Sequence, residues 1–312
     1  MSEPEPLLEA LLTLRDCIRW GVSRFEEHGL VYGHGTDNAL DEAVFLVTRA
    51  LHLPHDLPAA YLDARLTREE RARVIDLLRR RYQERIPAPY LVREAWFAEL
   101  SFYVDERVLV PRSPIAELIR EGYAPWIDPD RVHRVLDLCT GSGCIAVATA
   151  VWLPGTEVDA TELSADALEV ARINVARHAV GDRVRLLQAD LYPDAACGPY
   201  DIIVSNPPYV NAAALAGLPP EYRHEPVLGL DGGEDGLVLV HRILAGASDR
   251  LTENGILVVE VGDSAEALLA AYPEVPFLWP EFERGGEGVF LLTAEEVRRH
   301  RDLFERHAGG TT

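Results

Sequence analysis

Apolar residues in the first 85 positions recur at the three- and four-residue spacing of amphipathic helices. Asp37 and Asn38 can cap a helix that continues through Val47, because their side-chain oxygens accept backbone N–H groups at a helix start. Thr67 followed by Glu70 forms the capping-box pattern and predicts another helix. Ahead of these helices, a further apolar run comprises Leu7, Leu8, Leu11, Leu12, Leu14 and Ile18. The pattern predicts a small N-terminal helical bundle.

The hydrophobic pattern changes character over residues 87–110. Pro87 and Pro89 end the preceding helix, because proline lacks the N–H group that a helix interior needs. Short apolar and aromatic runs at 95–97 and 101–104 predict the two strands of a β-hairpin. Beyond the hairpin, Ser113 as N-cap and Pro114 as first helical residue predict a helix.

From residue 134 onward, short apolar runs alternate with helical patterns. The expected strands are 135–138, 157–161, 184–188, 202–205, 256–261 and 289–292, and the expected helices are about 143–153, 164–178, 236–250 and 264–271. Apolar strands separated by helices are typical of an α/β fold whose mostly parallel sheet is covered on both faces.

Composition narrows the function classes. The 312 residues carry 51 acids against 30 bases and no lysine, for a net charge of −21. Such a chain attracts basic proteins and repels a nucleic-acid backbone unless its bases are concentrated in one patch. The sequence has no long apolar stretch and no basic segment followed by an apolar leader. It therefore predicts no membrane span and no secretory signal. Four cysteines without metal-ligand spacing predict reduced thiols in a cytoplasmic protein and no metal site.

The segment from Asp137 to Gly143 joins a strand end to a glycine-rich turn and a helix start. Glycine lets the backbone approach a ligand closely, and the first N–H groups of a helix are unpaired. Ala146 stands where a dinucleotide fingerprint carries its third glycine, which the looser form of that fingerprint tolerates. A carboxylate at Asp137 suits an ammonium group better than a pyrophosphate. The loop therefore favours an amino-acid-bearing nucleotide, with a plain strand-to-helix turn as the alternative.

Two further acids follow the next two strands. Glu162 lies 25 residues after Asp137, where an acid can accept both hydroxyls of a ribose; alternatively, Glu162 or Ser164 caps the next helix. Asp190 could accept the exocyclic amine of adenine, or could be a solvated loop carboxylate. Ligands of open α/β sheets bind outside the carboxyl ends of the strands, so three acids at successive strand ends predict one nucleotide site.

A buried strand ends in Asn206-Pro207-Pro208-Tyr209. The two prolines make the turn rigid and remove N–H donors while leaving carbonyl acceptors. The Asn206 side-chain oxygen and the Pro207 carbonyl could thus present two acceptors to one planar –NH₂ group, with the Tyr209 ring beside it. A turn without a chemical role is the alternative interpretation.

The glycine loop and the Asn-Pro-Pro-Tyr turn together resemble class I S-adenosylmethionine-dependent methyltransferases that act on planar nitrogens. Nearly the whole chain resembles the HemK-type protein-glutamine methyltransferases, supported by residues 87–90, 225–236 and 284–288, although the last two segments could be structural turns. Residues 102–115 resemble the branch that modifies 50S ribosomal protein L-three. Cys139 departs from the glycine that many relatives have there and narrows the loop slightly.

The resemblance implies a Rossmann-like methyltransferase domain at 111–312, preceded by a helical substrate-recognition domain at 1–86 and a hairpin linker at 87–110. It implies methyl transfer to a glutamine amide of a basic protein, ribosomal protein L-three, in the cytoplasm, without direct contact with nucleic acid or membrane. Asn206, Pro207, Pro208 and Tyr209 would be the catalytic residues. S-adenosylmethionine would be held by Asp137, Cys139, Thr140, Gly141, Ser142, Gly143, Glu162, Asp190, Leu191 and Asn206.

Three other functions stay open at this point. The release-factor branch of the same family differs only in substrate and usually has Pro-Arg-Pro-Glu-Thr-Glu where this chain continues Pro-Arg-Ser-Pro-Ile. An adenine-amine DNA methyltransferase could use the same Asn-Pro-Pro-Tyr turn, but such enzymes usually carry a basic recognition region. A non-catalytic cofactor-binding scaffold would be expected to have lost Asn206 or a loop glycine, and this chain keeps both.

Overall fold

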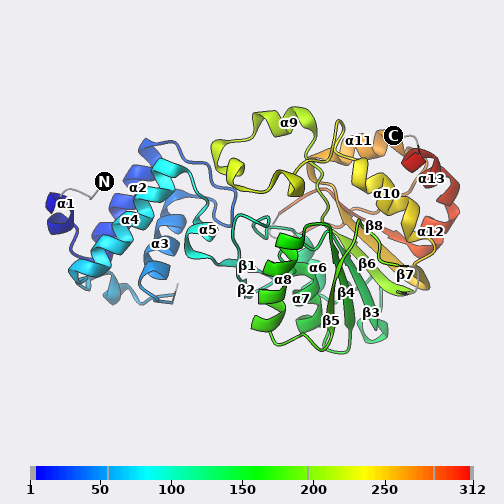
Figure 1. Ribbon diagram of the computed structural model, residues 1–312, viewed down its shortest axis with the longest axis horizontal. Helices are drawn as coiled ribbons and strands as arrows, with labels where there is room; N and C mark the ends of the chain where they lie inside the picture. The colour runs from blue at the N-terminus through cyan, green and yellow to red at the C-terminus, as the bar shows by residue number, and fades with distance from the viewer. Residues whose placement is uncertain (1–4, 55, 195–196, 284, 310–312) are drawn as a thin grey trace. The chain divides into compact units, whose positions relative to one another are not determined.

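The computed structural model describes residues 5–54, 56–194, 197–283 and 285–309, which form two compact units (Figure 1). The helical unit comprises Met1–Ala95 with Pro219–His224, and the sheet unit comprises Trp96–Leu218 with Glu225–Thr312. Residues 1–4 of the acidic N-terminus and Arg284 of the 284–288 segment lie outside the described residues. Within the described part of the chain, no helix has the length and apolar character needed to span a membrane.

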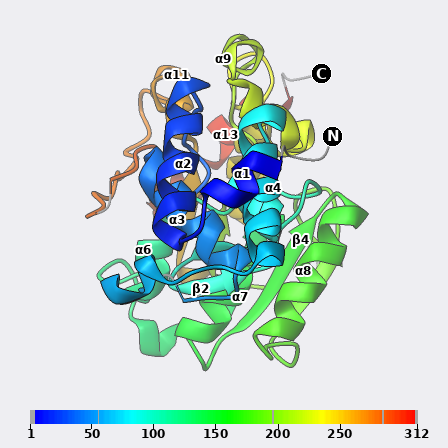
Figure 2. The ribbon, with the colours of Figure 1, turned by 90° about the vertical axis from the view of Figure 1, so that its left-hand side faces the viewer.

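The helical unit packs three main helices around one apolar core. Figure 2 shows the ribbons of these helices toward the viewer. Leu14, Leu46, Ile75 and Leu78 are almost completely buried in this core. The helices are α1 (Glu5–Ala10), α2 (Leu14–Glu27), α3 (Ala39–Ala50), α4 (Arg68–Glu84) and α5 (Ala88–Val92), with the 3₁₀ helix η1 (Ala59–Asp63) between α3 and α4. The N-terminal bundle predicted from helical spacing is therefore confirmed.

Capping residues set where these helices begin. Asn38 accepts the backbone N–H of Asp41 at the start of α3, and Thr67 and Glu70 form the predicted capping box of α4. The first apolar run does not form one continuous helix: Leu7 and Leu8 lie in α1, Leu14 and Ile18 lie in α2, and Leu11 and Leu12 lie between the two helices. Thr13 caps α2 by exchanging hydrogen bonds with Asp16, which interrupts the helix between the two segments.

A buried ion-pair network lies inside the helical unit. The Arg81 guanidinium, fully buried, donates to Glu42 at 2.6 Å and to the carbonyl of Val31 at 3.1 Å. Glu221, on the 3₁₀ helix η3 (Pro220–His224), accepts from Arg85 at 2.9 Å and from the N–H of Val31 at 3.2 Å. These bonds explain why Pro219–His224 belongs to the helical unit, although the chain on both sides of it belongs to the sheet unit.

The sheet unit contains a six-stranded sheet in the order β5-β4-β3-β6-β7-β8 (Figure 1). Strands β3 to β7 are parallel to their neighbours, and β8 is antiparallel to β7. The mostly parallel sheet is therefore confirmed. The strands are β3 (Arg134–Leu138), β4 (Glu157–Glu162), β5 (Val184–Gln188), β6 (Tyr200–Ser205), β7 (Leu251–Glu260) and β8 (Val289–Thr293).

Helices cover both faces of this sheet because its strands are continuous apolar runs, whose successive side chains point to opposite faces. Val135 on β3 packs into one core, whereas its neighbour Leu136 packs into the other. The first core includes residues of α6 (Ile115–Arg120), α7 (Cys144–Trp152) and α8 (Ala165–Arg177). The second includes residues of α10 (Val238–Ala247), α11 (Ala265–Ala271), α12 (Ala294–Arg299) and α13 (Arg301–Gly309). The predicted covering of both faces is confirmed.

Short elements connect these layers. The predicted two-stranded hairpin forms from β1 (Ala95–Phe97), with the expected bounds, and β2 (Leu100–Phe102), which begins one residue before and ends two residues before the predicted strand at 101–104. The prediction for the next helix needs correction, because α6 has Pro114 rather than Ser113 at its N-cap position. The Ser113 hydroxyl instead donates to a carboxylate from β7, described below. The remaining elements are η2 (Pro129–Arg131), α9 (Ala212–Gly217), η4 (Val227–Gly229) and η5 (Gly262–Ser264).

Candidate active site

A cavity of about 510 Å³ opens at the carboxyl ends of the parallel strands, within the sheet unit. Residues that follow β3, β4, β5 and β6 line it, and Glu260 at the end of β7 completes it. The strand order reverses between β3 and β6, which is the place where open α/β sheets bind their ligands. The cavity volume is in the usual range of a small-molecule site.

The glycine loop forms the floor of the cavity at the start of α7. Cys139 and Gly141 both have positive φ angles, +58° and +54°, which turn the chain sharply after β3. Gly143 also has a positive φ, +78°, and a Cβ there would lie 3.2 Å from the Cβ of Ala171, so a glycine allows α7 and α8 to approach. Four of the predicted loop residues, Cys139, Thr140, Gly141 and Ser142, line the cavity, whereas Gly143 does not.

Asp137 lies beneath this loop and does not line the cavity. One of its oxygens, Oδ2, accepts from the Thr140 hydroxyl at 2.5 Å and from the N–H of Ala146 at 3.1 Å. Its other oxygen, Oδ1, is buried and has no hydrogen-bond partner among the described residues. Burial raises the pKa of the Asp137 carboxyl to about 7, and the nearby Glu162 charge adds to this rise. A cation near the loop would therefore favour the ionised carboxylate.

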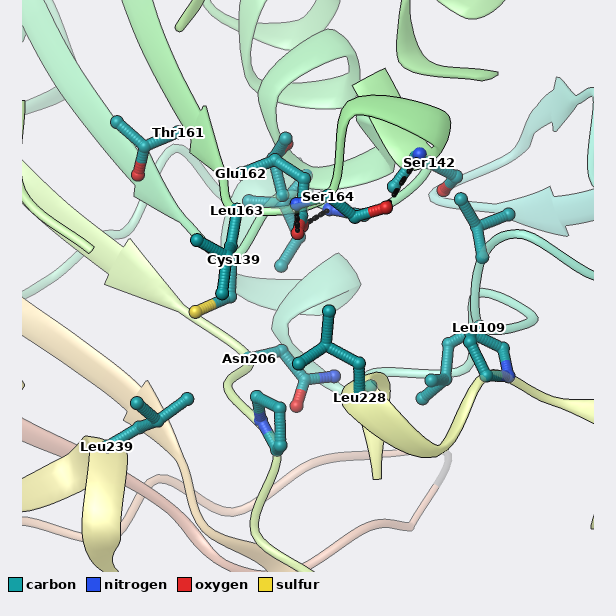
Figure 3. A pocket seen from close by; sticks show the side chains of 18 of the residues that line it. Leu109, Cys139, Ser142, Thr161, Glu162, Leu163, Ser164, Asn206, Leu228 and Leu239 are labelled. Atoms are coloured by element: carbon teal, nitrogen blue, oxygen red, sulfur yellow. Dashed lines mark hydrogen bonds between the residues drawn. The ribbon is translucent and has the colours of Figure 1, made fainter. Parts of the chain in front are cut away.

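Glu162 extends from the end of β4 to the rim of the glycine loop (Figure 3). Its two oxygens accept the backbone N–H groups of Gly141 and Ser164, each at 2.9 Å. Ser164 is the N-cap of α8, which bears out the capping alternative for that residue but not for Glu162. Each carboxylate oxygen of Glu162 keeps further lone pairs for ligand hydroxyls.

Asp190 and Leu191 follow β5 and form the next part of the wall. Asp190 is exposed, and its Oδ2 accepts from Arg242 of α10 at 2.9 Å. Leu191 is 6% exposed and has a φ of +65°, so the chain turns sharply at this part of the wall. The Asp190 carboxylate thus has a cationic neighbour that its position after a strand did not indicate.

The Asn-Pro-Pro-Tyr turn forms the opposite wall. Asn206, Pro208 and Tyr209 line the cavity, and Pro207 is buried without lining it. Figure 3 shows the Asn206 amide beside Leu228, at the far side of the cavity from Glu162. No described residue forms a hydrogen bond with the Asn206 side chain, which leaves its amide oxygen available to a ligand.

Glycines let neighbouring segments pass close to Tyr209. A Cβ at Gly262 would lie 2.4 Å from the Tyr209 ring, and a Cβ at Gly236 would lie 2.3 Å from its carbonyl oxygen. A Cβ at Gly288 would lie 2.4 Å from the carbonyl of Gly262. These close approaches assign a packing role to Gly236 and Gly288 in the two glycine-rich segments that the sequence left ambiguous.

Several polar residues near the site were missed in the sequence. Arg112 donates to the buried Glu225 through two bonds of 2.6 and 2.8 Å, and both oxygens of the buried Glu260 accept hydroxyl groups. Asn174, on the buried face of α8, bridges Tyr103 to the carbonyl of Ser142. The sequence signal available for Asn174 was a polar residue on an otherwise apolar helix face. Glu225 and Glu260 have no comparable signal in the sequence around them.

The parallel sheet, the cavity at its switch point and the Asn-Pro-Pro-Tyr turn define a class I methyltransferase. Consistent with this class, residues 124–217 match the family model "Methyltransferase small domain". A methyltransferase structure from Pyrococcus furiosus is 21% identical and covers 62% of this chain and 88% of its own, with a TM-score of 0.45. That overlap is low, and the fold class rests on the topology described above.

Two relatives define the family more closely. Proteins from Bordetella pertussis and Neisseria gonorrhoeae, both named ribosomal protein uL3 glutamine methyltransferase, are each 50% identical over 290 residues. These alignments cover 93% of this chain and 97% of each relative. The chain belongs to the family of ribosomal protein uL3 glutamine methyltransferases, which confirms the resemblance inferred from its motifs.

Proposed function

We propose that this protein transfers a methyl group from S-adenosylmethionine to the side-chain amide nitrogen of a glutamine in ribosomal protein uL3. The observation that carries the proposal is the Asn206 amide, which faces the cavity with no described partner, across from the glycine loop and Glu162. The names of relatives that match over nearly their full length support the choice of uL3 as the substrate.

The cavity fits S-adenosylmethionine by the chemistry of its polar groups. Glu162 offers carboxylate oxygens for the ribose hydroxyls, and Asp190 and Leu191 would hold the adenine. The glycine loop, Cys139 to Gly143, would hold the amino-acid end, and Asp137 supports that loop from below through Thr140 and Ala146. The buried, unpartnered Oδ1 of Asp137 adds negative charge beneath the place where an ammonium group would lie.

In the proposed mechanism, bound S-adenosylmethionine supplies an electrophilic methyl group. A glutamine amide is a weak nucleophile because its nitrogen lone pair is delocalised into the carbonyl. Asn206 Oδ1 and the Pro207 carbonyl would accept its two N–H groups and aim the nitrogen face at the methyl carbon. Positioning of this kind supplies several of the roughly 7–11 kcal/mol available from oriented reactants. The acceptors also stabilise positive charge that develops on nitrogen, which loses one of its two protons to solvent after the methyl group is transferred.

Labelled S-adenosylmethionine offered with purified uL3, a release factor or duplex DNA tests the proposal. We expect mass spectrometry to find one methylated glutamine in uL3 and little label elsewhere. The rate should fall with added salt, because a net charge of −21 steers a basic substrate and salt screens that field over about 10 Å at 0.1 M. Preferential methylation of the release factor would move this chain's activity to the sister branch, and methylated adenine would contradict a protein substrate.

Replacing Glu162 with alanine should weaken cofactor binding by roughly 1.5–3 kcal/mol, the value of hydrogen bonds to a charged group. The loss combines the proposed ribose contacts with the bonds that Glu162 makes to Gly141 and Ser164. Glu162→Gln, which keeps an acceptor oxygen, should lose less. Isothermal calorimetry provides the measurement, and an unchanged Kd for the alanine variant would place the ribose elsewhere.

Cofactor affinity should rise several-fold between pH 6 and pH 8. The Asp137 carboxyl of the free protein has its pKa raised to about 7, and a cationic ligand favours its ionised form, so binding releases a proton. The same raised pKa makes the unliganded fold lose stability as pH rises from about 4 through 7, because the folded state then binds more protons than the unfolded state.

Calorimetry in buffers of different ionisation enthalpy would measure this proton release. Asp137→Asn keeps one oxygen, which can accept from both Thr140 and Ala146 as Oδ2 does now, but the amide cannot titrate, so its cofactor Kd should be independent of pH. A pH dependence that survives in Asp137→Asn would assign the titration to another group.

A further inference from the structure

Glu260, the last residue of β7, is a buried carboxylate at the wall of the active-site cavity. It is 5% exposed, and both of its oxygens accept hydroxyl groups from distant parts of the chain. Oε1 accepts from the Tyr209 phenol at 2.8 Å, and Oε2 accepts from the Ser113 hydroxyl at 2.5 Å. The carboxylate therefore joins the Asn-Pro-Pro-Tyr turn to the segment that precedes α6.

Hydrogen bonds to a carboxylate are short and roughly twice as strong as those between neutral groups. Burial raises the pKa of Glu260, whereas the Ser113 and Tyr209 donors and the charge of Arg112 lower it. Removal of one hydroxyl would leave a charged oxygen buried without its donor, which is costly in a protein interior. This arrangement holds the polar end of the Tyr209 side chain in one place.

The rest of Tyr209 is also closely held. Its carbonyl oxygen accepts from the Ser264 hydroxyl at 2.8 Å, and glycines at 232, 236 and 262 allow the backbone to pack against it. The Glu260 bond completes this set at the phenol. A ring fixed at both ends forms a rigid wall next to Asn206, the proposed acceptor for the substrate amide.

We propose that Glu260 is a positioning residue for glutamine methylation, which it serves by fixing Tyr209 with the help of Ser113. This inference rests on the proposed function and deepens it. Ser113 belongs to the 102–115 segment, whose resemblance distinguishes the branches of the family. Through Glu260, that segment acts on the substrate half of the cavity rather than on the half that contains Glu162.

A double-mutant cycle on wild-type enzyme, Glu260→Leu, Tyr209→Phe and the combined variant tests this role with uL3 as substrate. Each single variant should lower kcat by roughly tenfold to a hundredfold, the range for losing a hydrogen bond to a charged group. The combined variant should be no slower than Glu260→Leu alone, because both changes remove one interaction. The Kd for S-adenosylmethionine should stay within about twofold of the wild-type value. A twofold change is small compared with the effect of losing a hydrogen bond to a charged group.

Conservative variants keep the test informative if Glu260→Leu fails to fold. Glu260→Gln can accept from one hydroxyl and donate to the other, so it should recover kcat to within about threefold of wild type. Ser113→Ala should lower kcat less than Tyr209→Phe does. As a matched control, Thr156→Val removes a buried hydroxyl bond at the opposite end of the sheet and should leave kcat unchanged.

The outcomes separate the two proposals. A wild-type enzyme inactive on uL3 would contradict the proposed function itself. Active wild type with fully additive losses in the cycle would overturn the positioning role of Glu260 alone. A Glu260→Gln variant as slow as Glu260→Leu would overturn it too, since hydrogen bonding would then not be what Glu260 contributes.

Discussion

Replacing Asn206 with alanine is expected to lower kcat by about 100- to 1,000-fold, the usual cost of removing one positioned group that stabilises transition-state charge. The Asn206 side chain faces the cavity and bonds to no described residue, so its loss should cost the protein little stability. Cofactor binding should stay within about tenfold of wild type, because most proposed cofactor contacts come from the glycine loop, Glu162 and the residues after β5. Single-turnover rates and calorimetry would measure the two effects separately.

Two variants sharpen this prediction. Asn206→Gln keeps the amide but displaces it by one methylene, and it should also be strongly impaired, because a catalytic group must be held within about 0.5 Å of its productive position. Asn254→Ala, at an exposed position in the first half of β7, is the matched control and should keep wild-type activity. Near-normal turnover by Asn206→Ala would exclude the proposed mechanism.

The strands and helices of the sheet unit were largely predictable because burial on both faces imposes continuous apolar runs. The strand expected at 184–188 has those bounds in the structure. β7, in contrast, begins at Leu251 rather than at the predicted residue 256. Thr252, Glu253 and Asn254 interrupt the apolar run, and long-range contacts extend the strand through them: Leu251 pairs with Tyr200, and the Thr252 hydroxyl donates to Asp201.

The candidate site was likewise predictable from the sequence only in part. Cys139, Glu162 and Asn206 could be brought together from the sequence, because the carboxyl ends of parallel strands share one edge of the sheet. The complete burial of Asp137 could not be inferred, since it depends on how the loop folds over the carboxylate. The Ser113–Glu260 contact joins residues 147 positions apart, and no local pattern encodes a pairing of that separation.

The sequence also could not predict that Pro219–His224 belongs to the helical unit. The segment follows the Asn-Pro-Pro-Tyr turn by about ten residues, so the sequence places it with the catalytic domain. Its place depends on Glu221, a fully buried acid whose partners Arg85 and Val31 lie in the first part of the chain. Only the folded bundle brings these partners together.

Replacing Glu42 with leucine is expected to destabilise the helical unit by about 3–5 kcal/mol, the cost of breaking a buried ion pair by removing one partner. Arg81 and Glu42 have side chains 1% exposed, with 2.6 Å between Nε and Oε1. The nearest other carboxylate, Glu221, lies 3.8 Å from Arg81 Nη1 and is already bonded to Arg85. The guanidinium would therefore stay buried with much of its charge uncompensated. Chemical denaturation followed by circular dichroism measures the loss.

The same variant tests the proposed substrate-recognition role of residues 1–86. If the helical unit binds uL3, Glu42→Leu should raise the KM for uL3 and leave the Kd for S-adenosylmethionine unchanged, because the cofactor cavity lies wholly in the sheet unit. Glu42→Leu combined with Arg81→Met should recover much of the stability, since apolar replacements of a whole buried pair are often neutral. Glu27→Gln, at an exposed pair with Arg24, should cost at most about 1 kcal/mol. If the helical unit unfolds and the KM for uL3 stays unchanged, residues 1–86 do not recognise the substrate.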